Sequence, residues 1–294
     1  MNEATISNCD WLSAVITVFI FFLGFYFNIL NERYKANKFL RDKELFFWEL
    51  MSALLTQIKT QITQNSDCIN RLKDPHELDT TLGKSSGQHI ESIKKLDEND
   101  LYKILIQRKR GGRKGKPKRI ANFHDLLVNL DYFTEAIPNL LESNQKTIEL
   151  INNYRIDWNE SHKKTMAIYN EYNHLNLVNN ISNDADEFLN KLNAIWKNFT
   201  DHHLNEKFLI KNGLDHVVQP FIDTCKKYSA DERSLYLLSI TQLSKEAYNE
   251  IEAAKANFSS VLNQTNQDFL RILSNLEQTT NYLKSLKTKS LLMP

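Results

Sequence analysis

The chain has 294 residues, of which 41% are hydrophobic and 25% are charged, and its formal net charge at pH 7 is +1. A nearly neutral chain has no global attraction for nucleic acid or an anionic membrane, so an electrostatic partner must bind a local patch. Only 7 glycines and 5 prolines are present, which favours long helices. The 3 cysteines are far apart and odd in number, which argues against a disulfide framework and against a cysteine metal site.

An uncharged stretch is the first predicted element. Residues 11–31, from Trp11 to Asn31, contain no Asp, Glu, Lys or Arg. At about 1.5 Å of rise per residue, a helix of this length matches a hydrocarbon core of roughly 30 Å. We therefore predict a transmembrane helix at 11–31, preceded by a short extracytoplasmic tail at 1–10. The tail has no basic residue and no small-residue cleavage pattern follows, which argues against a secretory signal peptide.

The charges that follow this stretch predict its orientation. Basic residues are concentrated on the cytoplasmic side of membrane helices. The downstream flank is rich in them, which predicts a single pass through the inner (cell) membrane, with the N-terminus outside and the C-terminal body in the cytoplasm. The basic residues of this flank are Arg33, Lys35, Lys38, Arg41 and Lys43.

Residues 32–106 are predicted to form membrane-proximal helices. Apolar residues recur every three, four or seven positions from Phe47 to Leu72, so one helical face continues from the membrane outward. This helix is expected to continue the transmembrane one and to end before Pro75. Asp97 is typical of the N-cap of a following helix.

A strongly basic segment occupies residues 107–121. No acidic residue lies between Asp100 and Asp125, and like-charge repulsion, glycines and a proline predict a mobile loop there. A solvated loop with no specific ligand is the favoured interpretation. The alternative is a polyanion site, for which anionic lipid or protein is the favoured ligand. Nucleic acid is less favoured, because no aromatic residue interleaves the run to stack on bases. The candidate residues are Arg108, Lys109, Arg110, Arg113, Lys114, Lys116, Lys118 and Arg119.

Residues 122–294 are predicted to form a bundle of long helices. One helix is expected to begin at Asn122 and to run to about Tyr172, with a kink at Pro138. Another is expected to be capped by Ser182 or Asn183. A shorter helical piece follows Gly213, a residue typical of a helix end.

The last predicted helix extends from Asp231 to about Lys287, without glycine or proline. Its apolar residues have near-heptad spacing, which indicates a coiled-coil-like seam, either within the bundle or between two copies of the chain. The seam is predicted to contain Leu243, Ala247, Ile251, Ala254, Phe258, Val261, Phe269, Ile272, Leu276, Leu283 and Leu286.

Short turns between long helices favour antiparallel packing of those helices. No stretch alternates apolar and polar residues between turn signals, which argues against a β-sheet. The predicted fold is therefore all-α: an N-terminal transmembrane helix followed by an elongated antiparallel helical bundle with coiled-coil-like long helices.

One Arg–His pair carries the only hypothesis for catalysis. Arg155 and His162 lie on a predicted helix with six residues between them. This spacing resembles that of HEPN-type ribonucleases, all-helical proteins in which such a pair is thought to serve in-line attack by the ribose hydroxyl. The resemblance implies a membrane-tethered ribonuclease as the alternative function. Ile156 departs from the family's pattern, because a polar residue usually follows the arginine of the motif.

A second polar pair is weighed as a metal site. His202 and Glu206 are one helical turn apart and could ligate a metal, but no third ligand is evident, so a polar surface face is favoured. No motif for nucleotide binding, nucleophilic catalysis or redox chemistry is present. No cofactor is predicted, and catalysis lacks positive support.

Several segments together resemble uncharacterised bacterial membrane-anchored helical proteins, some of which are labelled putative phage abortive-infection factors. The segments are the uncharged span, RDKELFFWELMSALLTQIKTQI, LDENDLYKILI and NFHDLLVNLDYF, and the resemblance extends over residues 11–158. It implies a role in phage defence at the inner membrane. The leading hypothesis is a single-pass scaffold or sensor whose cytoplasmic bundle binds a protein partner or itself.

Overall fold

The computed structural model describes residues 3–83, 88–107, 109, 115–179, 186–203 and 210–286. Every regular element in these residues is helical, which confirms the predicted all-α class. The elements are α1 (Glu3–Leu72), α2 (Gln88–Lys94), α3 (Glu98–Tyr102), the π-helix η1 (Lys103–Gln107), α4 (Lys116–Val178), α5 (Glu187–His203), α6 (Ile210–Gly213), the π-helix η4 (Leu214–Val218), α7 (Gln219–Lys227) and α8 (Glu232–Ser285).

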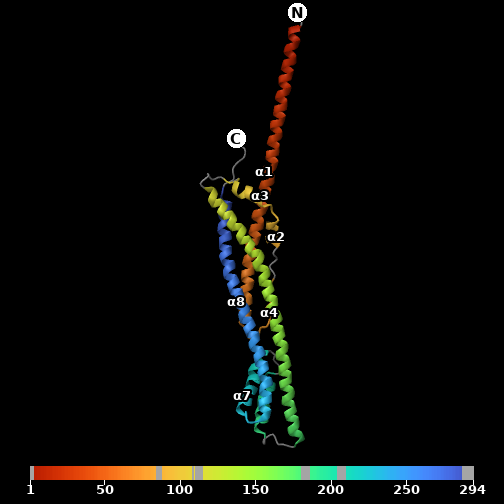
Figure 1. Ribbon diagram of the computed structural model, residues 1–294, viewed down its shortest axis with the longest axis vertical. Helices are drawn as coiled ribbons and strands as arrows, with labels where there is room; N and C mark the ends of the chain where they lie inside the picture. The colour runs from red at the N-terminus through yellow and green to blue at the C-terminus, as the bar shows by residue number, and fades with distance from the viewer. Residues whose placement is uncertain are drawn as a thin grey trace. The chain divides into compact units, whose positions relative to one another are not determined.

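The chain divides into two compact units. Unit 1 contains Met1–Gln57, Ser86–Thr134 and Leu273–Pro294, and unit 2 contains Ile58–Ser85 and Glu135–Ile272. The three longest helices, α1, α4 and α8, each contribute to both units. Within each unit α8 runs antiparallel to α1 and α4 (Figure 1).

Helix α1 has 70 residues and contains an 18-residue window of mean hydropathy 1.7. None of this window is buried, and all but one of the large apolar side chains from Val15 to Leu30 are between 38% and 70% exposed; Ile29 is half-buried. The first buried side chain described on α1 is that of Phe47. The helix then ends at Leu72, before Pro75, so the prediction of one continuous helix from the apolar span to Leu72 is confirmed.

Each long helix buries one seam of residues spaced three or four apart, with a single gap of seven in α4. Such spacing is the signature of coiled-coil-like packing. On α1 the buried seam is Phe47, Met51, Leu54, Ile58, Gln61, Asn65, Cys68 and Leu72. On α4 it is Phe123, Leu126, Leu130, Phe133, Ile137, Leu140, Asn144, Thr147, Ile151, Trp158, Ser161, Thr165, Ile168 and Tyr172. On α8 it is Leu237, Thr241, Ser244, Tyr248, Ile251, Lys255, Phe258, Leu262, Asn266, Phe269, Leu273, Leu276, Thr280 and Leu283.

The seam of α8 corrects two predicted positions. Leu243 is 49% exposed and Val261 is 41% exposed, so both lie outside the seam in which they were expected. The neighbouring seam positions are instead held by polar residues such as Thr241 and Ser244. A seam predicted from hydropathy alone is displaced here, because hydropathy does not identify hydroxyl groups that are buried with a hydrogen-bond partner.

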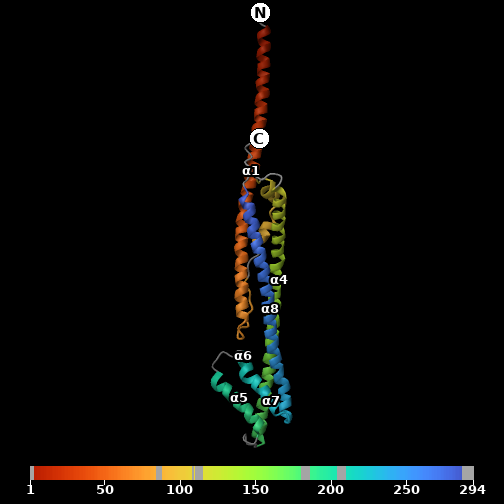
Figure 2. The same cartoon turned by 90° about the vertical axis from the view of Figure 1, so that its left-hand side faces the viewer.

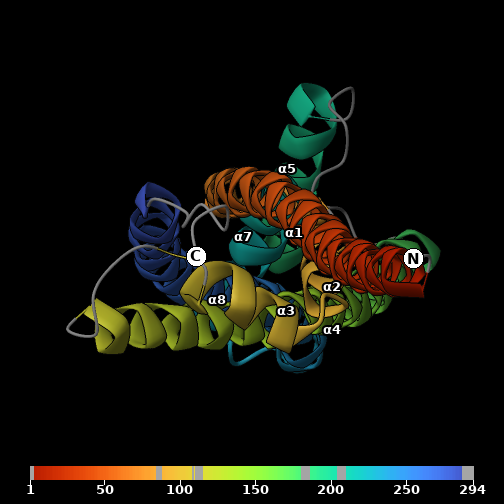
Figure 3. The same cartoon turned by 90° about the horizontal axis from the view of Figure 1, so that it is seen from above.

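In unit 1 the short helices α2 and α3 lie beside α1 and α4 (Figure 3). An ion pair of 2.6 Å joins Lys43 of α1 to Asp100 of α3, and one of 2.7 Å joins Lys94 of α2 to Asp131 of α4. Asp97 caps α3 by accepting a hydrogen bond from the amide of Asp100, as its position predicts.

In unit 2 the helices α5, α6 and α7 accompany the long helices (Figure 2). One core cluster contains Tyr169 and Tyr172 of α4, Leu192 of α5, Phe221 of α7 and Leu237 of α8. A second cluster unites α1, α4 and α8 through Cys68, Leu72, Leu140, Phe258 and Leu262.

Two predicted helix boundaries in unit 2 can be compared with the structure. Helix α6 ends at Gly213, as predicted, but the chain stays helical through η4 and α7 to Lys227. The π-helix ends at Val218, two residues before Pro220, whose ring and missing N–H disturb the preceding turn of a regular α-helix. Ser182 and Asn183 lie outside the described residues, and Asp186 accepts the hydrogen bond from the amide of Leu189 that caps α5.

Candidate functional site

The basic segment differs from the predicted loop in those residues that the structure describes. Helix α4 begins at Lys116, so Lys116, Lys118 and Arg119 are helical. Lys109 is only 3% exposed and forms a 2.5 Å ion pair with Glu44 of α1, and Arg119 is also buried. Composition cannot reveal this, because the compensating carboxylate lies 65 residues earlier in the chain.

The remaining polyanion candidates fall into two groups. Lys116 and Lys118 are exposed at the start of α4, and Lys118 lies over the ring of Tyr282 with 5.1 Å between the ammonium nitrogen and the ring centroid. Arg108, Arg110, Arg113 and Lys114 lie outside the described residues.

The two residues of the ribonuclease hypothesis have different environments on α4. Arg155 is exposed, whereas His162 is largely buried and stacks on Trp158 with 4.8 Å between ring centroids. Burial lowers the pKa of His162 to about 4, so its imidazole is neutral at pH 7. His162 lies seven positions after Arg155, which corresponds to about 10 Å along the helix axis. A ribonuclease role for this pair stays a prediction from spacing.

A cavity of about 360 Å³ lies beside Arg155 in unit 2. One wall is the strap, which we define as residues 74–82, the irregular segment that follows α1. The opposite walls come from α4 and α6. The lining residues are Pro75, His76, Leu78, Arg155, Asn159, Ile210 and Lys211.

A second cavity of about 250 Å³ lies along the strap and shares Leu78 and Arg155 with the first. Its other lining residues are Asp79, Thr80, Thr81, Ile148, Ile151 and Asn152. Both cavities are formed entirely by residues of unit 2.

Polar contacts, buried or partly buried except for that of Arg71, fix both ends of the strap. At its beginning, the carbonyl of Asp74 accepts a 2.8 Å hydrogen bond from the ammonium of Lys255, a residue 1% exposed in the seam of α8. At its end, the amide of Asn144 donates to the carbonyl of Thr80 at 2.6 Å, and Arg71 donates to the carbonyl of Thr81 at 2.6 Å. The strap is therefore a preorganised wall although it has no regular secondary structure.

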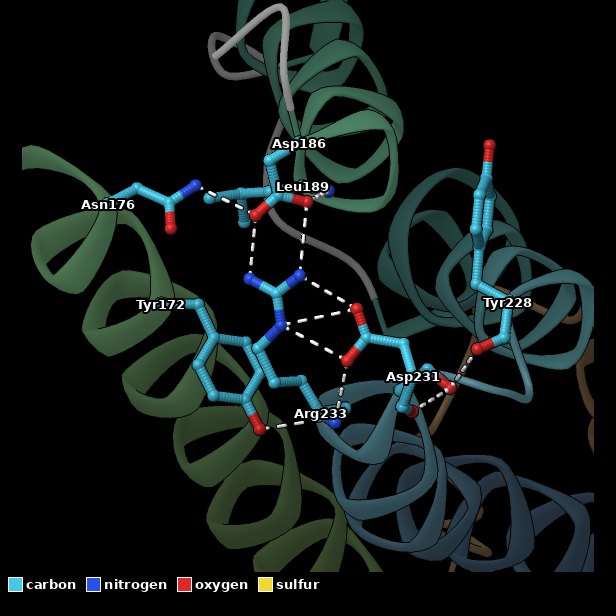
Figure 4. A network of polar contacts seen from close by, with 8 residues as sticks. Tyr172, Asn176, Asp186, Leu189, Tyr228, Asp231 and Arg233 are labelled. Atoms are coloured by element: carbon cyan, nitrogen blue, oxygen red, sulfur yellow. Dashed lines mark hydrogen bonds and ion pairs between the residues drawn. The ribbon is translucent and has the colours of Figure 1, made fainter. Parts of the chain in front are cut away.

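A network of charged residues joins three helices of unit 2 (Figure 4). The guanidinium of Arg233, at the start of α8, donates to Asp186 at 2.6 and 3.1 Å and also to Asp231 at 2.7 Å. Asn176 of α4 donates to Asp186 at 2.8 Å. Burial would raise the pKa of Asp186, but hydrogen bonds from Arg233, Asn176 and the Leu189 amide outweigh burial and lower it to about 2.

Polar residues also occupy the seams of unit 2. Asn65 of α1 donates to Asn266 of α8 at 2.8 Å, and Gln61 donates to Asn65 at 2.9 Å. Ser244 of α8 donates to Ser161 of α4 at 2.8 Å. Such layers cost stability relative to apolar packing, but they specify which residues face one another across a seam.

The pair that was weighed as a metal site, His202 and Glu206, is described only in part. His202 is exposed, with its ring Nδ1 3.0 Å from the carbonyl oxygen of Asn198, and Glu206 lies outside the described residues. Within the described part of the chain, no group of three or more His, Cys, Asp or Glu residues could hold a metal ion.

Sequence reasoning missed His76 and Lys211 as neighbours of Arg155. They come from segments far apart in the chain, and only the path of the strap and the position of α6 bring them to α4. The turn residue Pro75 was the one local signal, because it indicates that an irregular segment follows α1.

Comparisons with known proteins leave the chain without an assigned relative. No family model, no curated protein and no solved structure matches it.

Proposed function

We propose that the protein is a single-pass membrane protein whose helical body serves as a scaffold or sensor in the cytoplasm. The observation that supports this most strongly is the unburied apolar window of α1, which continues without a break into the packed bundle. Apolar side chains on every face of a helix require an apolar environment. The same helix, α1, also contributes residues to the buried seam of unit 2.

The charges beside the apolar window support the orientation. Arg33, Lys35, Lys38 and Arg41 are exposed on α1 directly after it. By the bias of basic residues toward the cytoplasm, the body lies in the cytoplasm. The inner membrane of a bacterium and a role in phage defence rest on the resemblance of residues 11–158 alone.

A reporter fusion tests the orientation. Green fluorescent protein fused after Pro294 is expected to fluoresce, and alkaline phosphatase fused at the same position is expected to be inactive, because that enzyme requires export to form its disulfides. Active alkaline phosphatase would place the body outside the cytoplasm and contradict the proposal.

Self-association is the partner interaction that the surface of α8 supports. Tyr236, Leu243 and Val261 are between 41% and 58% exposed. Their spacings of seven and eighteen residues put them within about 20° of one another around the helix. Exposed apolar residues on one face of a helix are the kind of residues that an interface between two copies of a helix uses.

The oligomeric state of the full chain in detergent tests this interface. We expect light scattering to detect a dimer. Its dissociation constant should increase at least tenfold in the variant Tyr236→Glu/Leu243→Glu, because each chain would bury two charges in the interface. Leu270→Glu is the matched control: Leu270 is 53% exposed on the same helix but on another face. A monomeric wild-type chain, or equal dimers in all variants, would overturn the self-association proposal.

A further inference from the structure

The cavity beside Arg155 is lined by three basic side chains and no acidic one. They are His76 on the strap, Arg155 on α4 and Lys211 on α6. Lys211 pairs with Asp215 at 2.7 Å, whereas no ion pair is described for Arg155 or for His76. Arg155 and Lys211 therefore bring two cationic groups to one cavity, beside His76, in a chain of nearly zero net charge.

The remaining lining is suited to an organic ligand. Pro75, Leu78 and Ile210 provide apolar walls, and Asn159 provides a neutral hydrogen-bonding group. At about 360 Å³ the cavity lies in the size range of small-molecule sites, and the second cavity continues it past Arg155. Asp79 lines the second cavity but not the first.

The wall that carries His76 is fixed before any ligand arrives. The strap is fastened at Asp74 by Lys255 and at Thr80 by Asn144, both through buried polar groups. A preorganised wall reduces the entropy lost on binding, so even a modest set of contacts yields measurable affinity. The guanidinium of Arg155 presents a planar fork of donors, which matches two oxygens of a phosphate.

We propose that this cleft binds a small phosphate ester such as a nucleoside monophosphate. The phosphate lies between Arg155, His76 and Lys211, and the organic part lies against Pro75, Leu78 and Ile210. The inference does not depend on the membrane proposal, since every residue involved belongs to unit 2 and lies outside the apolar window. The binding site would give the scaffold a chemical signal to sense.

Calorimetric titration of the detergent-solubilised full chain tests the proposal with three separate ligands: inorganic phosphate, adenosine and adenosine 5′-monophosphate. We expect the monophosphate to bind more tightly than inorganic phosphate, because it also uses the apolar walls, and adenosine to bind weakest. Arg155→Gln is expected to raise the Kd of the monophosphate about tenfold, the loss of one charge-assisted hydrogen-bonding group.

Two further variants make the test specific. Lys211→Gln should also weaken binding, whereas Lys163→Gln, an exposed lysine of α4 that lines neither cavity, should not. The proposal is overturned if neither phosphate compound binds at millimolar concentration, or if Arg155→Gln and Lys163→Gln behave alike. Binding of an RNA oligonucleotide without binding of the monophosphate would also overturn it. A correctly oriented membrane protein with no ligand would leave the membrane proposal standing and remove only this one.

Discussion

Arg233 pairs with Asp186, which lies 47 positions earlier in the chain. It lies at the start of α8, while Asp186 precedes α5 and Asn176 is near the end of α4. The side chain of Asp186 is 8% exposed, so its carboxylate depends on these partners in place of water. The contacts of this one carboxylate therefore fix how three helix ends meet within unit 2.

Replacing Asp186 with Asn tests this connection. The variant loses the charge while keeping the shape, and we expect the free energy of unfolding to fall by about 1–3 kcal/mol in urea titrations. Because the pKa of Asp186 is about 2 in the folded state against 3.8 ordinarily, its contribution is complete above pH 4 and lost as the pH falls toward 2.

The control for Asp186 is Asp268, which pairs with an exposed arginine on α8, Arg271. Asp268→Asn should change the free energy of unfolding by less than about 0.5 kcal/mol, as exposed ion pairs usually do. Equal effects of the two substitutions would mean that the Arg233 network does not fix the helix ends.

His162 predicts a second pH dependence in a different range. Burial lowers its pKa from 6.5 to about 4, so the folded state favours the neutral ring. Between pH 6.5 and pH 4 the unfolded state binds a proton at this histidine and the folded state does not. The free energy of unfolding therefore falls over this range, by up to about 3 kcal/mol. The difference in stability between wild type and His162→Gln should therefore change between pH 7 and pH 4. A pH profile that is the same in wild type and in His162→Gln would contradict burial of this ring.

At the scale of the elements, the three seams explain which helices can pack together. The alternation of threes and fours on α1, α4 and α8 keeps one face of each helix inward over its whole packed length. Within unit 2 the layer of Asn65 and Asn266 restricts the register of α1 against α8, because any shift leaves buried amides without partners.

The substitution Asn266→Leu tests the polar layer. It removes the partner of the buried Asn65 amide, and we expect it to lower the free energy of unfolding by about 1–3 kcal/mol although it adds apolar area. Asn263→Leu is the matched control, since Asn263 is exposed one turn earlier on the same helix. Unchanged or increased stability of Asn266→Leu would show that this layer does not hold the register.

The elements were more predictable from sequence than the site. The scarcity of glycine and proline and the regular apolar spacing were enough to predict that α1 ends at Leu72. They also predicted the last helix, α8, with both of its bounds correct within two residues. The seam of α8 was predicted only in part, because Thr241, Ser244, Lys255 and Asn266 are polar residues that burial makes acceptable through distant partners. The cavity beside Arg155 was not predictable, since its basic residues are brought together by tertiary packing alone.

At the scale of the whole molecule, α1 is the element on which the account depends. Its apolar window is unburied, whereas from Phe47 onward the same helix has a buried seam. The change along one continuous helix separates the part suited to lipid from the part suited to packing against α4 and α8.

Extraction of cell membranes with alkaline carbonate tests this central claim most directly. The full chain should remain in the membrane pellet, and the variant Phe19→Asp/Leu23→Asp/Phe27→Asp should move to the soluble fraction, because three charges in the span cost about 7–10 kcal/mol. The control Phe39→Asp/Leu45→Asp/Phe46→Asp alters exposed apolar residues beyond the span and should stay in the pellet. Release of the wild-type chain into the soluble fraction would contradict the account.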